Sequence, residues 1–462
     1  MDKMDYAKGL TEKIVQYTLD LTYDKIPKKT IEMQNHCVND ILGCLLGATT
    51  LDDSVVKAAE YASQYQGPCT MLVNGKKTTP ELAALVNGTL SHALDFDDSH
   101  DAVVHPSGVV FPACLAIAEY LGNVSGKDFI TALVIGTDLS SRFALGMDHL
   151  ILEFGWNHPS IMQEMGAVFG AAKLMGLDHD QILDAVALAM TQFTCSGESM
   201  EAKGSVIRTM RDGFAAQAVV SSVIMAKMGV HARFETPFEG KYGFYTMYTH
   251  GDWTPEKVIK DLGVKFETDN ITFKPWPSCK TTHSPIQAMQ EIMDENNLSK
   301  DDVESVHILG QAGMKMTMEP FEFKLHPEST GIAKASMPFV IGTILNYHDV
   351  NLMSFTQERL KDPAIAEQGK KVTAEYHPTW GRDEATFIDM TVKTKKGEFK
   401  KHIEQPTGGI GFPLSDEQVK NKFIACAKFY RKKLSDAELE KLFEVSYHVD
   451  ELSNVNELIK LL

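Results

Sequence analysis

The residues best suited to chemistry lie between His92 and Ser107. Four carboxylates and three histidines fall within fourteen residues there, after one apolar stretch and before another. Polar groups placed between buried segments must be hydrogen-bonded or face a cavity. If the preceding helix continues far enough, His92, Asp95 and Ser99 share one face, and Pro106 then starts a new helix. The cluster predicts part of an active site, and a capped, solvated helix end is the alternative.

Two metal-dependent interpretations also apply to this cluster. Asp97, Asp98 and Asp101 form a DDxxD pattern, which in all-helical prenyl synthases holds Mg²⁺ and a diphosphate. Such enzymes need a second acidic motif on a later helix, and no helical segment after residue 200 carries one. A metal-dependent hydrolase would need an HExxH motif or a second His-Asp pair, which the sequence lacks. Its candidate ligands are His92, Asp98, His100 and His105. We expect no metal.

Histidine and cationic side chains recur at the predicted starts of two later helices. His158 lies just ahead of a Gly- and Ala-rich helix, where a side chain points from a loop into a cleft. Arg208 and Arg211 lie at the front of an apolar helix, and Lys203 precedes them. A cation at a helix N-terminus opposes the helix dipole unless an anion is bound there. The two arginines therefore predict an anion site, with a solvated basic turn as the alternative.

A third group of polar side chains surrounds two prolines and a tryptophan. Lys274, Lys280 and His283 occur in the segment KPWPSCKTTH. A proline-rich turn is rigid, so it suits polar groups that must be held ready for a ligand. This segment is a candidate binding element at the entry to the part of the chain with strand patterns.

The hydrophobic pattern predicts that a mainly α fold positions these residues. From residue 8 to about 250, apolar residues recur at helical spacing, and many of these stretches are rich in Ala and Gly and apolar on more than one side. That composition is typical of helices packed closely against several neighbours. Thr79 and Pro80 mark the start of the helix that leads into the cluster.

The pattern changes near residue 265. Near-alternating β-branched residues predict strands at 304–309 and 386–392, and residues 395–397 (Lys-Lys-Gly) predict a hairpin turn. Helical spacing returns near the C-terminus, with Ser415 as a cap.

A chain of 462 residues is about three times the usual domain size, so two domains or one with an insert are expected. We expect a large all-helical domain formed from both chain ends, residues 1–265 and 401–462. A smaller α/β domain, residues 266–400, is inserted in it.

Charge and cysteine content exclude several classes of protein. The formal net charge of -17 argues against a general nucleic-acid binder, but a few cations in a cleft can still bind an anionic substrate. The seven cysteines are scattered and never form CxxC, which suits a reducing compartment. The first residues lack the apolar core of a signal peptide, and the longest apolar run, 109–121, is too short to span a bilayer. We expect a cytoplasmic enzyme with no membrane or nucleic-acid partner.

Seven segments, running in order through nearly the whole chain, resemble the MmgE/PrpD family. They are LDFDDSHDAVVHPSG, GWNHPS with the Gly/Ala helix after it, RDGFAAQA, KYGFY, KPWPSCKTTH, KASMPFVIG and PLSDEQVKNKF. This family includes cis-aconitate decarboxylases, 2-methylcitrate dehydratases and an iminodisuccinate epimerase. The resemblance implies a helical domain built from both chain ends, an inserted α/β lid, a homodimer, and catalysis without a metal or organic cofactor.

The decarboxylase pattern of the family carries over to six positions of this sequence: Asp95, Ser99, His105, His158, Lys274 and His283. Where the decarboxylases have a lysine, Arg208 or Arg211 lies near. A tyrosine shortly before a proline in the decarboxylase lid is absent here, because MKMTMEP offers only Met316 and Met318. The WGHPSDN-type segment of the longer dehydratases is also absent, so the sequence is nearer to the decarboxylase pattern.

The resemblance implies a lyase acting on a small anionic polycarboxylate, most simply by cis-aconitate-type decarboxylation. Dehydration of a 2-methylcitrate-type substrate and epimerisation of a dicarboxylate are the alternatives on the same scaffold. His105 or His158 would donate or accept the proton, with Asp95 orienting its imidazole. The groups that would bind the substrate are Ser99, Arg208 or Arg211, Lys274 and His283. The other carboxylates, Asp97, Asp98 and Asp101, are expected to be structural.

Overall fold

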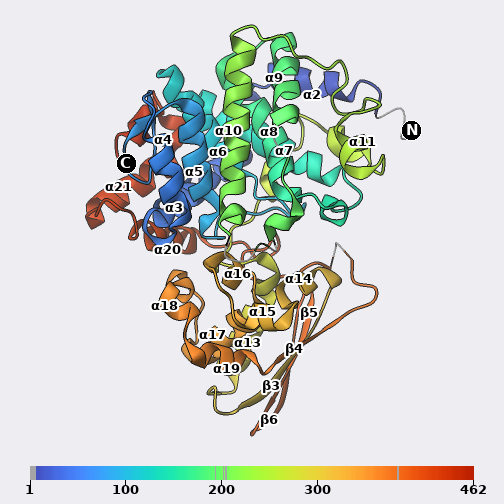
Figure 1. The fold of residues 1–462 in the computed structure, drawn as a ribbon, viewed down its shortest axis with the longest axis vertical. Helices are drawn as coiled ribbons and strands as arrows, with labels where there is room; N and C mark the ends of the chain where they lie inside the picture. Colours follow the sequence, from blue (N-terminus) through green and yellow to red (C-terminus); the bar gives the residue numbers. More distant parts are fainter. Residues whose placement is uncertain (1–6, 193, 201, 203–204, 382–383) are drawn as a thin grey trace.

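The computed structural model describes residues 7–192, 194–200, 202, 205–381 and 384–462 of the chain. A large helical body lies above a smaller part that contains a four-stranded sheet (Figure 1). The prediction of a mainly α fold is confirmed. Among the described residues, no helix combines the length and apolarity needed to cross a bilayer.

Long helices with small residues at their contacts form most of the body. They are α2 (Leu10–Asp20), α3 (Lys28–Leu51), α4 (Ser54–Ala62), α5 (Pro80–Ala93), α6 (Ser107–Leu121), α7 (Gly126–Leu145), α8 (His158–Met175), α9 (His179–Gln192) and α10 (Ile207–Lys227), with the short α11 (Phe244–Thr249) and α12 (Pro255–Ile259) and a small hairpin of β1 (Cys69–Thr70) and β2 (Lys77–Thr78). A Cβ on Gly213 of α10 would come within 2.3 Å of the Leu85 carbonyl oxygen of α5. Only glycine therefore lets these two helices lie so close.

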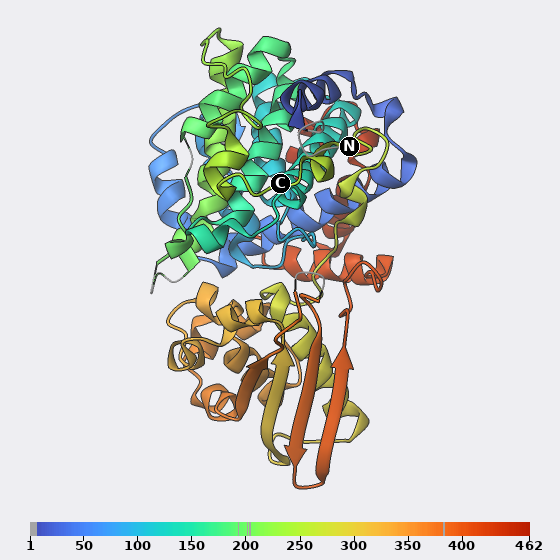
Figure 2. The same ribbon diagram turned by 90° about the vertical axis from the view of Figure 1, so that its right-hand side faces the viewer.

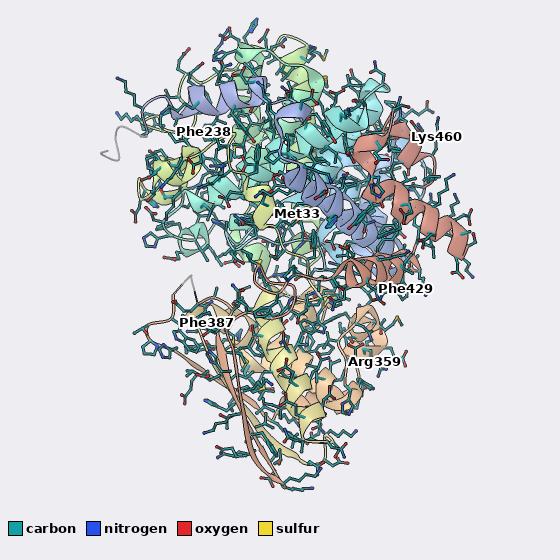
Figure 3. The ribbon with its side chains drawn as sticks, turned by 180° about the vertical axis from the view of Figure 1, so that it is seen from behind. Met33, Phe238, Arg359, Phe387, Phe429 and Lys460 are labelled. Carbon is teal, nitrogen blue, oxygen red and sulfur yellow. The ribbon has the colours of Figure 1, made fainter. Side chains whose placement is uncertain are left out.

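The C-terminal part of the chain packs back on the body. Its helices are α20 (Asp416–Ala427), α21 (Asp436–Tyr447) and α22 (Asn456–Ile459). Apolar residues from both ends of the chain, between Leu10 and Phe266 and between Phe423 and Leu458, share one hydrophobic core. Helix α20 lies against α3. Ser415 caps α20 as the sequence predicts, because its hydroxyl accepts the Gln418 N–H. Seen from behind, Phe429 just after α20 lies at the lower edge of the body (Figure 3).

The smaller part, residues 276–403, is called the lid below and has its own hydrophobic core. Its strands are β3 (Val303–Gly310), β4 (Val372–Tyr376), β5 (Ile388–Thr394) and β6 (Gly397–Ile403). The sheet order is β4-β3-β5-β6, with β3 and β4 parallel and the other pairs antiparallel. Lys395 and Lys396 connect β5 to β6, so the predicted hairpin is confirmed.

Helices of the lid cover one face of this sheet (Figures 1 and 2). They are α13 (His283–Glu295), α14 (Lys315–Met318), α15 (Phe321–Leu325), α16 (Thr330–Lys334), α17 (Met337–Tyr347), α18 (Gln357–Leu360) and α19 (Pro363–Gly369). Strand β6 runs to Ile403, past the expected boundary at residue 400. The exact domain limits stay a prediction.

The chain crosses between body and lid twice, and the two crossings touch. Gly408 has φ +85°, and a Cβ there would lie 2.4 Å from the carbonyl oxygen of Phe273. Both the left-handed backbone and the close approach require glycine. Ile271, Phe273 and Cys37 form a small apolar cluster at this junction.

Helix α5 ends at Ala93, so the condition under which His92, Asp95 and Ser99 would share one face is not met. Asp95 has φ +50°, and its left-handed backbone takes the chain off the helix axis. Ser99 lies in an isolated antiparallel bridge with Thr272. His92, Asp95 and Ser99 therefore come from three different local structures.

Three buried lysines from distant parts of the chain bind carbonyl groups of the last residue of α5 and of the turn after it. The pairs are Lys334 Nζ with Ala93 O at 2.6 Å, Lys274 Nζ with Asp95 O at 3.0 Å, and Lys422 Nζ with Phe96 O at 2.6 Å. The last carbonyls of a helix lack partners within it and carry partial negative charge, so they attract cations. These tertiary contacts stabilise the turn that follows α5.

Candidate active site

The candidate residues gather at the border between the body and the lid. The turn after α5, residues 94–106, supplies Asp95, Asp97 and His105. The starts of α8 and α10 and the crossing segment 271–283 approach it. The structure thus brings together segments that are far apart in the sequence.

Asp95 forms ion pairs with two cations. Its Oδ1 lies 2.5 Å from Lys274 Nζ, and its Oδ2 lies 3.2 Å from a guanidinium nitrogen of Arg208. Burial disfavours the charged carboxylate, but the neighbouring charges of Lys274, His92 and Arg208 outweigh it and hold the pKa of Asp95 well below its usual range. Both oxygens thus pair with cations and, among the described residues, neither is hydrogen-bonded to a histidine ring, so Asp95 orients Lys274 and Arg208 rather than an imidazole as expected.

A chain of hydrogen bonds runs from Arg211 through His92 to Asp97. Arg211 Nη2 lies 3.0 Å from His92 Nε2, and His92 Nδ1 lies 3.0 and 3.2 Å from the two carboxylate oxygens of Asp97. All three side chains are almost fully buried. Burial raises the pKa of Asp97, but its interactions with His92 and His105, including the hydrogen bond from His92, dominate and lower it well below the ordinary value.

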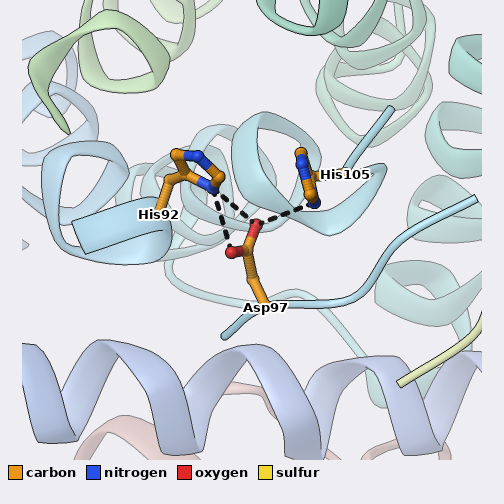
Figure 4. Close-up of side chains that lie close together, drawn as sticks. All are labelled: His92, Asp97 and His105. Carbon is orange, nitrogen blue, oxygen red and sulfur yellow. Dashed lines mark hydrogen bonds and ion pairs between the residues drawn. The ribbon is translucent and has the colours of Figure 1, made fainter. Parts of the chain in front are cut away.

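His105 lies beside this chain (Figure 4). Its Nδ1 is 2.7 Å from the carbonyl oxygen of Asp98 and 3.7 Å from Asp97 Oδ2, and its ring centre is 4.8 Å from that of His92. Its side chain is 17% exposed, against 2% for His92. Burial and the charge of Lys274 lower the pKa of His105 to about 3. The imidazole is therefore neutral near pH 7 when the site is empty.

Asp98 and Asp101 contact residues that shape the turn. Asp98 accepts hydrogen bonds from the N–H and the hydroxyl of Ser107 at the start of α6, at 3.2 and 2.5 Å. Burial raises the pKa of Asp98 to about 7, although the Ser107 hydrogen bond lowers it in part. Asp101 forms an ion pair with Lys280 at 2.7 Å.

The remaining predicted residues line the same border but are held by backbone groups. His158 is the first residue of α8, and its Nε2 lies 3.2 Å from the carbonyl oxygen of Ala102. The Nε2 of His283 lies 3.1 Å from the carbonyl oxygen of Ser278. Burial and the charge of Lys274 lower the pKa of His283 to about 3. The Ser99 hydroxyl lies 3.1 Å from that of Thr272.

The two arginines of α10 have different surroundings. Arg208 lines a cavity of about 400 Å³ between body and lid, whose wall also includes Met200, Ser329 and Thr330. Arg211 is 3% exposed and lies beneath the site, where it contacts His92. Arg208 therefore has the access that an anionic ligand needs, whereas Arg211 is occupied within the protein. Lys203 lies outside the described residues.

His92, Asp97 and His105 also have the spacing of a metal site, because their ligand atoms lie within 4.8 Å of one another. The ring nitrogens that face Asp97 are already hydrogen-bonded, and the charges of Lys274 and Arg211 lie close by. Cations around a carboxylate oppose the binding of a further cation. The chemistry of this group is better suited to proton transfer than to metal binding.

Two contributors were not singled out by the sequence. Lys334 lies in the segment KASMPFVIG, and Lys422 lies in PLSDEQVKNKF, so both fall within segments that resemble the family. Nothing in their local pattern indicates that they reach the end of α5. Only the folded chain brings their ammonium groups there.

Known proteins resemble the chain over most of its length. Residues 12–256 match the MmgE/PrpD N-terminal domain and residues 276–446 match the MmgE/PrpD C-terminal domain. A cis-aconitate decarboxylase of Aspergillus terreus is 24% identical over 481 residues, covering 98% of this chain and 96% of its own. A human cis-aconitate decarboxylase is 25% identical, covering 98% and 95%. A 2-methylcitrate dehydratase of Salmonella typhimurium is 22% identical, covering 87% and 86%.

Proposed function

The chain belongs to the MmgE/PrpD family and is a lyase, and we propose that it decarboxylates a small polycarboxylate of the cis-aconitate type by proton transfer from a histidine. Similarity to cis-aconitate decarboxylases over nearly full length supports this substrate class. The observation that carries the proposal is the placement of His105, the more exposed imidazole of the buried pair, near Lys274, whose partner Asp95 also holds Arg208.

The reaction needs only binding groups and one acid. The bond between the leaving carboxylate and its carbon breaks, and its electron pair forms a new double bond to the neighbouring carbon. The electrons of the original double bond then take up a proton on the far carbon, and CO₂ leaves. Cations that hold the retained carboxylates stabilise the charge that develops. An imidazolium supplies the proton.

The structure supports distinct roles for the residues at the border. We assign the proton donor to His105, because its ring is reachable while His158 is 2% exposed and bonded to a backbone carbonyl. Arg208 binds a retained carboxylate from the wall of the cavity, with Lys274 beside it. Asp95 holds both cations in place, and Ser99 and His283 complete the binding surface.

A substrate panel tests the proposal. The purified protein is incubated with cis-aconitate, 2-methylcitrate and hydroxy-dicarboxylates in deuterated buffer, and the products are followed by NMR. Loss of CO₂ from cis-aconitate, with deuterium on the far carbon, is the expected result. Loss of water from 2-methylcitrate would instead favour the dehydratase, and deuterium exchange without net change would favour the epimerase. Turnover of none of these compounds would overturn the proposed class.

Variants then test the assignment of the acid. His105→Ala should lower turnover at least ~10²-fold without unfolding the protein. His149→Ala, which changes an exposed histidine elsewhere in the body, is the matched control and should leave turnover unchanged. Near-normal turnover in His105→Ala would move the acid to His158.

The proposal includes a cytoplasmic homodimer that works without a metal or organic cofactor. The family resemblance supports these features. Light scattering of the purified protein tests the dimer, and metal analysis of the active protein tests the cofactor. A stoichiometric bound metal would contradict the proposal.

A further inference from the structure

We infer that Arg211, His92 and Asp97 form a relay of positioning residues that keeps the proton of His105 on Nδ1 and leaves its Nε2 for the substrate. This inference rests on the proposed function, because it gives His105 the role of acid. The relay adds two residues, His92 and Asp97, to those with an expected role in the reaction. It also gives Arg211 a role other than substrate binding.

The first step is the tautomer of His92. A guanidinium only donates hydrogen bonds, so the His92 Nε2 that lies 3.0 Å from Arg211 must accept. An imidazole that accepts at Nε2 is neutral and carries its proton on Nδ1. That proton faces the carboxylate of Asp97 at 3.0 and 3.2 Å. The partners therefore assign a single tautomer to His92.

The second step is the orientation of Asp97. Both of its oxygens lie within hydrogen-bond range of His92 Nδ1, so the carboxylate is held in place. On its other side, a Cβ on Gly108 would come within 2.9 Å of the Gln163 amide nitrogen and 3.6 Å of Asp97 Oδ2. Gly108 therefore leaves the space beside Asp97 Oδ2 free of a side chain, and the two contacts with His92 Nδ1 are what fix the carboxylate.

The third step is the tautomer of His105. Its Nδ1 faces the carbonyl oxygen of Asp98 at 2.7 Å and Asp97 Oδ2 at 3.7 Å, and both groups only accept. The proton of neutral His105 therefore lies on Nδ1. The second ring nitrogen, Nε2, receives a proton when the imidazole becomes charged and donates that proton to the substrate.

The relay matters because the negative charge of Asp97 opposes the effect of the positive charge of Lys274 on His105. Burial and Lys274 from the crossing segment disfavour a charged ring, while Asp97 and Asp95 from the turn favour it; His92 from α5 faces the ring as a neutral imidazole. The Asp97 carboxylate lies 3.7 Å from the Nδ1 that stays protonated and adds a negative charge to the nearer, uncharged Asp98 carbonyl. Removing its charge lowers the pKa of His105 in the substrate complex, so the rate falls at a lower pH than in the parent protein.

A matched pair of substitutions separates the two hydrogen bonds of His92. In His92→Asn the side-chain amide takes the place of Nδ1 and still donates to Asp97. In His92→Gln the longer side chain takes the place of Nε2 and still accepts from Arg211. The relay predicts that His92→Gln lowers kcat about tenfold or more with little change in KM, while His92→Asn keeps kcat within about threefold. Ser91→Ala, at the neighbouring buried position of α5, is the control.

The pH dependence of kcat in Asp97→Asn is a second measurement, and it should not change if Asp97 has only a structural role. We expect the alkaline limb of its kcat profile to shift to lower pH by about one pH unit or more. The limb in Ser91→Ala should stay in place. An unchanged limb in Asp97→Asn, or equal losses in His92→Asn and His92→Gln, would overturn the relay.

NMR of the protein labelled with ¹⁵N-histidine tests the relay without any activity. Spectra of His92→Asn and His105→Gln identify the two signals by their loss. In its neutral form each ring should carry the proton on Nδ1, and a neutral form of either ring with the proton on Nε2 would refute the relay even if the variants do not fold. If the tautomers are as expected but no polycarboxylate is converted, the proposed function fails and the hydrogen-bond relay stands.

Discussion

Binding of a polycarboxylate should draw one proton from solution into the site. His105 is neutral near pH 7 because its pKa is about 3 in the empty site. It can act as an acid only after it has taken up a proton. The most direct source of stabilisation for that added charge is the negative charge of the substrate itself.

The energy needed to charge His105 is similar in size to the energy that the substrate carboxylates can return. Charging His105 at pH 7 costs about 5 kcal/mol, because each pH unit above the pKa corresponds to about 1.4 kcal/mol. A carboxylate about 5 Å from the ring contributes about 3 kcal/mol at an effective dielectric constant near 20. Two such carboxylates offset the cost, so the charged ring becomes the main form in the complex.

Titration calorimetry measures the proton directly. Propane-1,2,3-tricarboxylate is the ligand, because it lacks the double bond that would receive the shifted electron pair. Titrations near pH 7 in two buffers with different ionisation enthalpies give the number of protons taken up per ligand bound. About one proton is expected for the parent protein and for His283→Gln, and about none for His105→Gln. Uptake that is absent in the parent protein, or unchanged in His105→Gln, would refute the reasoning.

Three further predictions concern stability. Lys274→Met leaves the buried Asp95 carboxylate without its closest cation and should lower the free energy of unfolding, measured by urea denaturation, by about 3–5 kcal/mol. The double variant with Asp95→Asn should recover part of this loss. Burial raises the pKa of the Asp98 carboxyl to about 7, so between about pH 4 and pH 7 the folded state binds more protons than the unfolded state. The contribution of this group to the free energy of unfolding therefore falls by up to ~4 kcal/mol as the pH rises through that window. The slope of the free energy of unfolding against pH should flatten in Asp98→Asn and not in Ser91→Ala. Lys334→Met leaves the Ala93 carbonyl unpaired and should lower the free energy of unfolding by about 1–3 kcal/mol. Backbone hydrogen exchange in residues 94–99 should be faster than in the parent protein. Unchanged exchange would show that the lid does not stabilise this turn.

Much of the fold could be predicted because its signals are local. Helical spacing, the Pro80 start of α5, the Ser415 cap and the hairpin at 395–396 each depend on a few neighbouring residues. The density of charged and histidine residues at 92–107 likewise marked this segment as part of a site. Segment-by-segment resemblance then indicated the family, which the matches over both halves of the chain confirm.

The end of α5 could not be predicted in the same way. The sequence after Ala93 is compatible with another turn of helix, so it left open whether Asp95 and Ser99 share a helix face with His92. Lys334 binds the last carbonyl of the helix, and Lys274 and Lys422 bind carbonyls of the turn after it, from 241, 179 and 326 residues away. No local pattern contains those contacts.

The sequence by itself determined the residue types at the site and the elements that present them. Only the tertiary structure decided their partners: Asp95 with two cations, Asp97 with two imidazoles, and Arg211 with His92 rather than with open space. The physical reason is that protonation states and tautomers depend on atoms within hydrogen-bond distance in space. Those atoms come from α5, the turn after it, α10 and the crossing segment, and folding alone brings them together.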